Sequence, residues 1–460
     1  MINSHPQTDF AHPEEINTFL SAHPEISLFE IFLVDPNGVL RGKWLKREEV
    51  AAIYQEGRPL PASIHSLNTL GEDVVETGLI WDVADCDCRA YPIANSIRIQ
   101  PWRSLPTASI QIMMHPTEGM PAYSGDPRGV LLNLLQRLAI DDLIPDIAIE
   151  YEFYIIDPTK KLASQKGTPF YAPLDELNQV YDLNGINNNE KFFTDIYRSC
   201  EEQRLPVRTA ISEYGPGQLE ITLEHQANAL LAVDQAIALK HLIKQVARKY
   251  NYLATFMAKP FSELSGSGMH QHISLVDTHH QNLFASERPS GSELMHHAIA
   301  GILQHAQECV AIFCPTGNSY KRFQSLSYAP THNNWGVNNR TVSVRIPTGS
   351  SQSRHLEHRI CGADANPYIT LAATLACMYQ GIQLKLQLPP EQKGNAYDDA
   401  SCPTLSFQWQ EALDHFSKST LLESMLGESF HSIYHKIKTQ ECKSYNSQVT
   451  QLDHGWYFNI

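Results

Sequence analysis

The sequence predicts an α+β protein with a small β-rich N-terminal domain, residues 1–118, and a large α+β domain, residues 119–460. Short β-rich segments separated by turn residues dominate the first of these regions. In the second region, long segments with helical periodicity are mixed with strand-like segments. A chain of 460 residues is also long enough to fold as more than one domain.

The N-terminal domain begins with a predicted short helix at residues 12–22, because Pro13 and the two acids after it are typical of a helix start. Residues 27–34 and 39–45 are β-rich. The segment Asp35-Pro-Asn-Gly38 between them is a strong turn signal, so we predict a β-hairpin. Further strands are expected at residues 78–83, 96–101 and 108–114.

The large domain is predicted to contain several helices and strands. One helix begins after Asp126-Pro127, because Leu and Val then recur near the 3.6-residue period of a helix. Segments rich in Pro, Asn, Gly and Asp are expected to be loops. We expect helices at residues 126–139, 230–250, 291–314 and 366–386, strands at 147–156, 252–259 and 269–276, and loops at 160–190 and 389–403.

Charge and composition exclude several classes of protein. Lys and Arg number 35, Asp and Glu number 50, and the net charge of −15 disfavours non-specific binding to nucleic acid. No segment approaches the roughly 18 apolar residues that span a membrane, and residues 1–10 lack the basic start and apolar core of a signal peptide. The nine cysteines are expected to be thiols. We therefore expect a cytoplasmic protein with no nucleic-acid or membrane partner.

Four glutamates lie in two motifs that suit a metal site. Glu150 and Glu152 are two apart on a predicted strand, so their carboxylates share one face while Tyr151 takes the other. Two buried carboxylates side by side stay ionised only beside a cation. Glu213 and Glu220 flank a Gly-Pro-Gly turn. A solvated strand face is the alternative interpretation of the first motif.

A Gly/Ser loop, residues 265–268, leads into a strand that carries His270 and His272 on one face. Glycine lets the backbone approach a ligand closely, and a His-x-His pair is a candidate ligand site, with buried structural histidines as the alternative. Later motifs contain arginines, whose guanidinium group suits carboxylate and phosphate. A solvated surface would also hold arginines, but mixed with Lys and Glu at helical spacing. These arginines are Arg322, Arg340, Arg345 and Arg359.

With Glu357 as a fifth acid, these carboxylates and one or two histidines favour Mg²⁺ or Mn²⁺ over a thiolate zinc site. Paired cations and arginines are what phosphoryl transfer from ATP requires, because they neutralise and position the phosphates. No Walker-type Gly-x-x-x-x-Gly-Lys-Ser/Thr motif occurs in the sequence. The nucleotide is therefore expected to be held in another way.

Taken in order along the chain, these motifs resemble the glutamine synthetase family. The resemblance covers nearly the whole chain, and the ordered motifs are specific together where each alone is weak. The motifs are Arg41-Gly-Lys43, Glu150-x-Glu152, Glu213 to Glu220, Lys259-Pro260, Gly266-Ser-Gly-Met-His270-x-His272, Asn318-Ser-Tyr-Lys-Arg322, Asn339-Arg340, Arg345-Ile-Pro347, Glu357-x-Arg359 and Ala365-Asn-Pro-Tyr368.

The resemblance implies a β-grasp-like N-terminal domain and a catalytic domain whose strands form half of a funnel-shaped site. It implies a homo-dodecamer of two stacked hexameric rings, with sites between neighbouring subunits. The implied reaction is attack of the glutamate γ-carboxylate on ATP, which gives γ-glutamyl phosphate, followed by displacement of phosphate by an amine. The implied ligands are glutamate, ATP, an amine and two or more Mg²⁺ or Mn²⁺ ions per site.

Carried over position by position, the resemblance implies a role for each motif residue. One metal would be bound by Glu152, Glu213 and Glu220, and the other by Glu150, His270 and Glu357. The implied nucleotide-binding residues are His272, Ser274 and Arg345. The implied glutamate-binding residues are Gly266, Arg322, Arg340 and Arg359, and the implied catalytic residues, which handle the transferred phosphate and the γ-carboxyl, are Arg340, Arg345 and Arg359.

Two departures from the family concern the amine. Glutamine synthetases bring an Asp to the ammonium site from an Asp-Gly-Ser-Ser segment, but the corresponding residues 56–64 of this chain contain no such Asp. Those enzymes also have a Glu on the flap, where this chain has Tyr328. Ammonium needs these acids, so we predict a larger amine, such as putrescine, spermidine or spermine. Tyr328 and Trp335 are candidates for its entrance, with packing between subunits as the alternative for Trp335. Residues 60–64, 256–260, 335–341 and 362–367 resemble the γ-glutamylpolyamine synthetase (glutamate–putrescine ligase) branch.

Two alternative functions stay open. One is a glutamine synthetase that uses ammonium, and the other is a non-catalytic structural or regulatory member of the same fold, which the six retained ligand positions disfavour. Two further departures affect the site. Ser265 stands where the family usually has an Asn that contacts glutamate. His355 stands where many members have an Arg near the nucleotide, which would weaken the contacts with ATP or pass them to Arg354.

Overall fold

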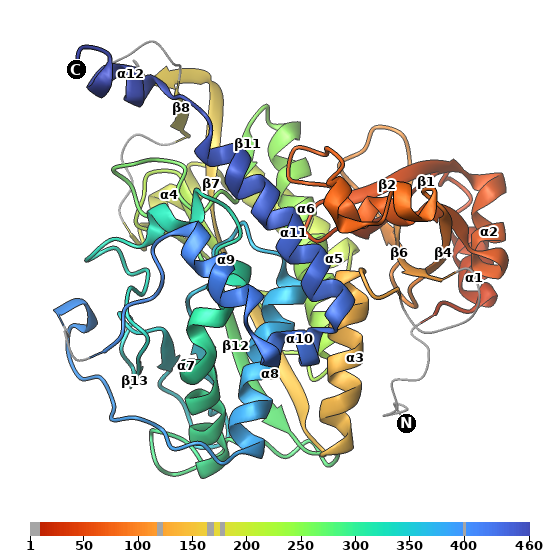
Figure 1. The fold of residues 1–460 in the computed structure, drawn as a ribbon. Coiled ribbons are helices and arrows are strands. Elements are labelled where there is room, and N and C mark those ends of the chain that lie inside the picture. The colour runs from red at the N-terminus through yellow and green to blue at the C-terminus, as the bar shows by residue number, and fades with distance from the viewer. Residues whose placement is uncertain (1–9, 117–122, 163–169, 175–179, 399–401) are drawn as a thin grey trace.

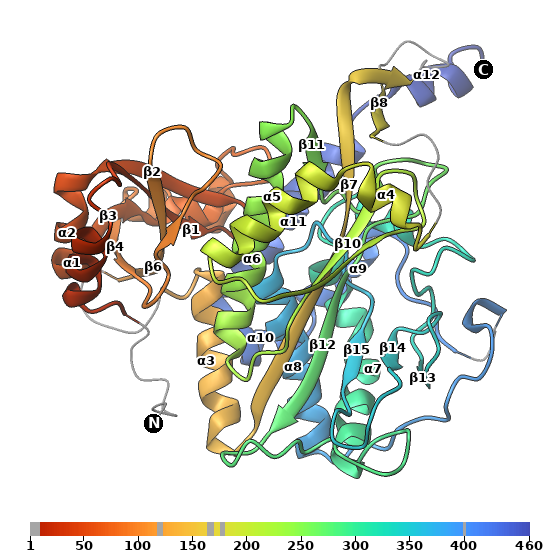
Figure 2. The ribbon, with the colours of Figure 1, turned by 180° about the vertical axis from the view of Figure 1, so that it is seen from behind.

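The computed structural model describes residues 10–116, 123–162, 170–174, 180–398 and 402–460. Two sheets, one of six strands and one of nine, lie side by side, with the N-terminal sheet in red and orange (Figures 1 and 2). Each sheet has its own cluster of buried apolar side chains. The predicted α+β class is confirmed.

The N-terminal sheet is built around the predicted hairpin. Strand β1 (Leu28–Val34) pairs antiparallel with β2 (Leu40–Lys46), and helix α2 (Arg47–Glu56) follows directly. Strand β6 (Thr107–His115) then returns beside β1 and runs parallel to it, which gives the β-grasp-like arrangement. The other elements are α1 (Pro13–Ala22), β3 (Arg58–Pro61), β4 (Asp87–Pro92) and β5 (Arg98–Ile99), and the strand order is β2-β1-β6-β4-β3 with β5 on β6.

Two strand predictions in the N-terminal region need correction. Residues 78–83 form a turn and a 3₁₀ helix, Trp81–Val83, instead of a strand. Gly78, in the left-handed conformation with φ of 80°, ends a preceding 3₁₀ helix, Val75–Thr77, so no strand begins there. Trp81 is 75% exposed, so its large apolar side chain does not pack against a sheet within the chain. The strand predicted at residues 96–101 shrinks to the two residues of β5.

The nine-stranded sheet is organised by its longest strand, β7 (Ile144–Leu162), which pairs with four others. Along β7, Tyr151 and Phe153 are buried in the core, whereas Glu150 and Glu152 are on the opposite face, as the sequence predicts. The other strands are β8 (Phe170–Pro173), β9 (Val207–Ser212), β10 (Gln218–Leu223), β11 (Leu253–Thr255), β12 (Met269–Val276), β13 (Trp335–Val337), β14 (Val344–Ile346) and β15 (Leu356–His358), in the order β13-β14-β15-β12-β7-β10-β9 with β8 and β11 on β7.

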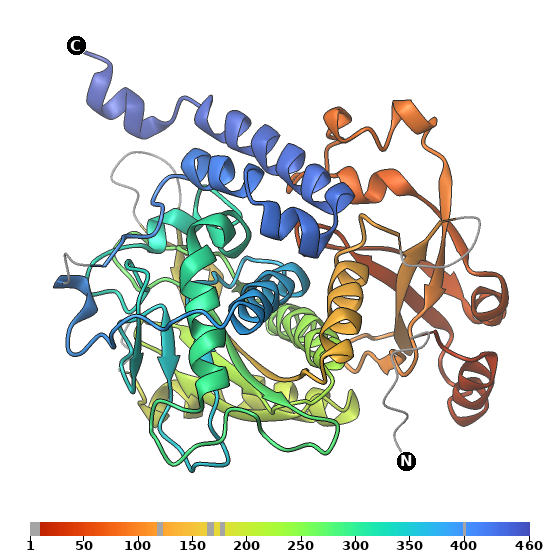
Figure 3. The same cartoon turned by 60° about the horizontal axis from the view of Figure 1, so that its bottom comes forward.

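Helices cover the core face of this sheet. Side chains of Asp126, Asn228, Ser292 and Asn366 cap the N-termini of the four helices that the sequence predicts, which explains why each begins where it does. The C-terminal helices lie on the far side of these helices from the sheet (Figure 3). The four predicted helices are α3 (Pro127–Ile140), α6 (Ala229–Lys249), α7 (Glu293–Phe313) and α8 (Pro367–Gln383).

The segments predicted as loops are only partly loops. Within residues 160–190 the structure contains β8 and helix α4 (Leu183–Asn187), which the Asp182 side chain caps, so the prediction is wrong there. Residues 389–398 contain only one 3₁₀ turn, Ala396–Asp398. The strand predicted at 252–259 is limited to β11. Helices that the sequence analysis did not predict are α5 (Glu190–Glu202), α9 (Trp409–Ser417), α10 (Thr420–Leu426), α11 (Glu428–Asn446) and α12 (Gln451–Tyr457).

The predicted domain boundary at residues 118 and 119 lies outside the described residues. The two sheets with separate hydrophobic clusters support the division, which we propose for the chain. None of the nine cysteines, all of which lie in the described residues, forms a disulfide. In the part of the chain that the structure describes, every helix is too short or too polar to cross a membrane.

A buried polar cluster joins the N-terminal sheet to three helices. Arg128 of α3 donates from Nε and Nη2 to the two carboxylate oxygens of Asp234 on α6, at 2.9 and 2.8 Å. The Tyr368 hydroxyl of α8 also donates to Asp234, and Gln111 of β6 donates to that hydroxyl at 2.6 Å. Loss of one partner of such a pair leaves a buried charge that is no longer neutralised.

Asp234→Ala is therefore expected to lower the free energy of unfolding by about 3–5 kcal/mol, because it removes the carboxylate that neutralises Arg128. Urea denaturation followed by circular dichroism measures this loss. As a control, Glu202→Ala breaks the exposed Arg198–Glu202 pair of α5, in which Nε and Oε1 are 3.4 Å apart, and should cost under about 0.5 kcal/mol. Equal losses for the two variants would contradict the prediction.

Candidate active site

A cavity of about 250 Å³ lies on the sheet face opposite the core helices. Its floor carries Glu150 and Glu152 of β7, and its rim carries Arg340 and Tyr328. The remaining lining residues that the sequence predicts for a site are Glu213, Glu220, Ser265, Gly266, His270, Arg322 and Arg359. Most of the predicted site residues are thus brought together in one cavity.

Strand register explains why residues distant in sequence meet here. In the β7–β10 pair, Glu152 lies opposite Glu220. In the β7–β12 pair, Glu150 lies opposite His270, and in the β12–β15 pair the adjacent His272 lies opposite Glu357. Directly opposed residues on neighbouring strands have Cβ atoms about 5 Å apart. Register alone therefore places these acids and histidines in one group.

Glu152, Glu213 and Glu220 form the first carboxylate cluster, with oxygen atoms that all lie within 4.8 Å of one another. Burial, reinforced by the charge of Glu152, raises the pKa of Glu213 to about 7. Burial and the charges of neighbouring glutamates raise the pKa of Glu220 well above its usual range. Three hard oxygen donors that repel one another suit a divalent cation such as Mg²⁺ or Mn²⁺, so these residues fit the predicted metal.

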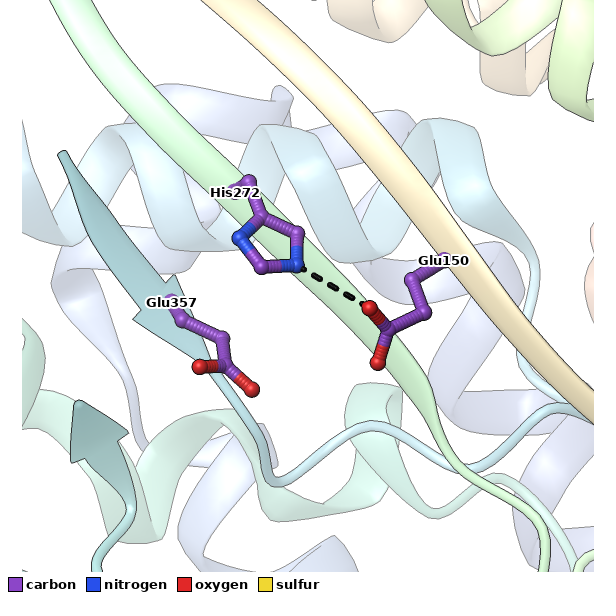
Figure 4. A group of neighbouring side chains, drawn as sticks. All are labelled: Glu150, His272 and Glu357. Carbon is purple, nitrogen blue, oxygen red and sulfur yellow. Dashed lines mark hydrogen bonds and ion pairs between the residues drawn. The ribbon is translucent and has the colours of Figure 1, made fainter. Parts of the chain in front are cut away.

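The second group contains Glu150, His270, His272 and Glu357. His270 Nδ1 lies 2.6 Å from a Glu150 oxygen and 3.7 Å from a Glu357 oxygen. His272 Nε2 lies 3.4 Å from the other Glu150 oxygen, and its ring lies between Glu150 and Glu357 (Figure 4). Either histidine can therefore complete a ligand set with Glu150, so the structure offers His272 beside the predicted His270.

Two arginines hold Glu357 in its ionised form. Arg345 Nη1 donates to Glu357 Oε2 at 2.7 Å, and Arg359 Nη1 donates to Oε1. Burial alone would raise the pKa of Glu357, but the charge of Arg359 and the two histidines hold it at about 2. Both of its carboxylate oxygens are thus engaged by arginine, and the two halves of the site differ in charge balance.

The Gly266 backbone and Arg322 pack closely at one end of the cavity. A Cβ atom on Gly266 would lie 2.3 Å from Arg322 Cγ, so no larger residue fits there without a shift. The buried Arg322 is fixed by donation from Nη1 to the carbonyl of Ile360 at 3.0 Å. Beside them, the Ser265 hydroxyl donates to Gln218 Oε1 at 2.5 Å. The serine that stands in place of the family's usual Asn is therefore directed toward Gln218.

Several predicted residues lie outside the cavity lining. Glu357 is one of them, and Arg345 contacts only Glu357 among the acids, whereas His272 contacts Glu150, which does line the cavity. Ser274 is buried two positions further along β12. His355, which stands where many family members have an Arg, lies with its Nε2 atom 3.2 Å from Nδ1 of His272. It is therefore next to one of the predicted nucleotide-binding residues. Trp335 is buried and donates its indole N–H to the carbonyl of Pro389 at 2.8 Å, so the structure does not bring it to the cavity.

The sequence analysis did not single out several lining residues. Tyr214 is 57% exposed, and its ring centroid lies 5.7 Å from that of Tyr328, so the two form an aromatic pair at the rim. Gln218 donates to the Gly266 carbonyl at 2.9 Å and so joins the Gly-Pro-Gly turn to the Gly/Ser loop. Both residues lie between Glu213 and Glu220. Their position inside this acidic motif was the only sequence signal that could have pointed to them.

A model of the glutamine synthetase catalytic domain matches residues 124–457. The chain belongs to the glutamine synthetase family. This family member is 33% identical to gamma-glutamylputrescine synthetase PuuA of Escherichia coli, over 97% of its own length and 94% of that protein. It is 30% identical to glutamate–isopropylamine ligase of a Pseudomonas species, over 97% and 98%.

Two further relatives extend the comparison. The chain is 33% identical to gamma-glutamylethanolamide synthetase GlnA4 of Streptomyces coelicolor, over 96% of its own length and 94% of that protein. The solved structure of a GmaS/ADP complex superposes with a TM-score of 0.84 at 25% identity, covering 97% of this chain and 99% of the other. The glutamine synthetase fold of the chain is therefore established over almost its full length.

Mg²⁺ is expected to raise the melting temperature, and to raise it more at pH 8 than at pH 6. The pKa of Glu213 rises from 4.5 to about 7 on folding, so the metal-free fold loses stability as the pH rises through this interval. At pH 8 the cation meets ionised carboxylates, whereas at pH 6 it must displace protons. At a concentration of 100 Kd the gain is about 2.7 kcal/mol.

Differential scanning fluorimetry of Glu220→Gln and Glu202→Gln provides the matched test. The first substitution removes one ligand and should abolish most of the Mg²⁺-dependent shift. The second removes an exposed charge on α5 and should leave it unchanged. A shift that is independent of pH, or one that survives Glu220→Gln, would contradict a metal site at this cluster.

Proposed function

We propose that this protein is an ATP-dependent ligase that joins the γ-carboxylate of glutamate to an organic amine through γ-glutamyl phosphate. A polyamine such as putrescine, spermidine or spermine is the proposed acceptor. The observation that carries the proposal is the cavity itself, which is lined by four glutamates and His270 together with Arg340, Arg359 and Tyr328. The relatives whose names specify putrescine, isopropylamine and ethanolamine support the amine class.

The proposed metal ligands are those of the two carboxylate groups. One Mg²⁺ or Mn²⁺ would be held by Glu152, Glu213 and Glu220. Another would be held by Glu150, Glu357 and His270, whose Nδ1 lies 2.6 Å from Glu150 and 3.7 Å from Glu357. When bound, the cations neutralise the ATP phosphates. Their proposed positions are supported by the convergence of hard oxygen donors and by the raised pKa values of Glu213 and Glu220.

The proposed roles of the other residues follow from charge and position. Arg322 and the Gly266 backbone bind glutamate at the end of the cavity where they pack together, while Arg340 and Arg359 bind the γ-carboxylate and the transferred phosphate. Fixed guanidinium groups stabilise the negative charge that develops on the phosphoryl oxygens. The other proposed role assignments are nucleotide binding by His272, Ser274 and Arg345, and phosphate handling by Arg345.

The acceptor is the point at which this site differs from one built for ammonium. Among the described residues that line the cavity, every acid belongs to the two metal groups, and Tyr328 is one of the lining residues. An ammonium ion would find no separate carboxylate, whereas an organic amine offers methylene groups or a distant cation to the Tyr214–Tyr328 pair. Trp335, which is buried, is not included in this proposed amine site.

We also propose the implied dodecamer and a cytoplasmic location. Large apolar side chains of the N-terminal region are exposed in the single chain, among them Trp44 at 59% and Leu70 at 81%, which suits burial against a neighbouring subunit. The free thiols suit a reducing compartment.

The first test is phosphate release by the purified protein with ATP, Mg²⁺ and glutamate while the amine is varied. We expect a polyamine to give about 10- to 200-fold higher kcat/KM than ammonium, because each buried methylene adds binding energy that ammonium lacks. Ammonium as the best acceptor would overturn the proposed acceptor. If no amine supports phosphate release above the level of the Arg340→Gln variant, a non-catalytic role is favoured.

Tyr328→Ala is expected to raise the KM for the amine about 3- to 30-fold, because it removes one face of the aromatic pair. The KM values for ATP and glutamate should stay unchanged, and Tyr328→Phe should keep the wild-type value. Tyr328→Glu restores a carboxylate at the flap and should improve the use of ammonium relative to Tyr328→Ala. Steady-state kinetics of the four proteins decides between an amine contact and a purely structural tyrosine.

A further inference from the structure

A second cavity, of about 340 Å³, lies between the N-terminal hairpin and the helix face of the large sheet. The turn residues Asn37 and Gly38 line one wall, and α6 lines the other. From α6 the cavity receives Lys240, His241 and Lys244. It is separated from the candidate active site by the sheet, because α6 covers the face opposite the catalytic carboxylates.

The two lysines are held inside this cavity without a carboxylate partner. Lys240 Nζ donates to the carbonyl of Ala363 at 2.6 Å and lies 5.1 Å from the centroid of the Phe256 ring. Lys244 Nζ lies 5.6 Å from the same centroid and makes no hydrogen bond to any described residue. No described carboxylate oxygen lies within 4.0 Å of either ammonium nitrogen. Burial, reinforced by the charge of Lys244, lowers the pKa of Lys240 to about 7.

The nearby acids are engaged by other groups, except that the buried Oδ1 atom of Asp364 accepts no hydrogen bond from a described residue. Glu30 accepts a hydrogen bond from Arg103 at 2.7 Å and lies 3.7 Å from His241. Asp364, which also lines the cavity, accepts through Oδ2 from the hydroxyls of Ser319 and Thr316 at 2.7 and 2.9 Å. Asp364 therefore offsets part of the positive charge but does not form an ion pair with either lysine.

Helix geometry concentrates the charge further. Lys240, Lys244 and Arg248 are four residues apart in succession, so they form one row on α6. Like charges at this spacing destabilise a helix unless a counter-ion neutralises them. Contact with aromatic rings compensates for only part of the hydration that a buried ammonium group loses.

We propose that this cavity is a binding site for a small anion whose carboxylate or phosphate group pairs with Lys240 and Lys244. The site is independent of the proposed ligase reaction, because its residues belong neither to the metal groups nor to the cavity that holds them. An anion bound here contacts α6 on one side and the β1–β2 turn on the other. Its binding therefore links the N-terminal hairpin to the large domain.

Calorimetric titration of the full chain with inorganic phosphate and, separately, with succinate tests the proposal. The background is Arg340→Gln, which weakens anion binding in the candidate active site. We expect at least one of the two anions to bind, and Lys244→Gln in this background to weaken that binding at least about tenfold. Lys244→Arg should retain it, and Arg198→Gln, which removes an exposed charge on α5, should not change it.

Chemical labelling of the Arg340→Gln protein gives a second readout that does not depend on how the lysine variants fold. Acetylation of Lys240 and Lys244 should be slowed by the anion that binds, whereas Lys249, which is paired with Asp195 at 2.6 Å, should be unaffected. The preferred probe distinguishes a phosphate site from a carboxylate site. Binding of neither anion, equal binding to the Lys244→Gln protein, or no protection of the two lysines would overturn the proposal.

Discussion

Repulsion between buried carboxylates is the constraint on which the site depends. Glu152, Glu213 and Glu220 approach within 4.8 Å of one another, and burial raises the pKa values of the last two. Such a cluster forms only if the rest of the fold supplies the stabilisation. The alternate residues of β7, with Tyr151 and Phe153 in the core, supply it on the opposite face of the same strand. Stability and chemistry are thus divided between the two faces of one strand.

The two halves of the site solve the charge problem in different ways. The pKa of Glu357 is held at about 2, where the charge of Arg359 and the histidines outweighs its burial, whereas Glu213 and Glu220 favour the protonated form. A cation is therefore needed most at the Glu213–Glu220 side. On the other side, Arg345 and Arg359 already neutralise Glu357.

The sequence was informative where local rules and tertiary packing agree. Strand β12 has the predicted bounds, and the alternation along β7 placed Glu150 and Glu152 on one face before any partner strand was known. The prediction failed at residues 78–83, where apolar residues remain exposed, and at α4, whose Asp182 cap lies in a segment rich in turn residues. Strand register, which no local pattern encodes, determined that His272 approaches Glu150 and Glu357, and it left Trp335 in the core.

The N-terminal region is fixed to the large domain but contributes no described residue to the candidate active site. Gln111 and Tyr368 connect β6 to the buried Arg128–Asp234 pair, and the Lys438 ammonium group donates to Asn37 in the hairpin turn at 2.5 Å. All described residues that line the catalytic cavity lie between Glu150 and Arg359. Within the described residues, the large domain alone therefore supplies the lining of this cavity, and the hairpin turn packs against α6 on the opposite, helix-covered side of the sheet.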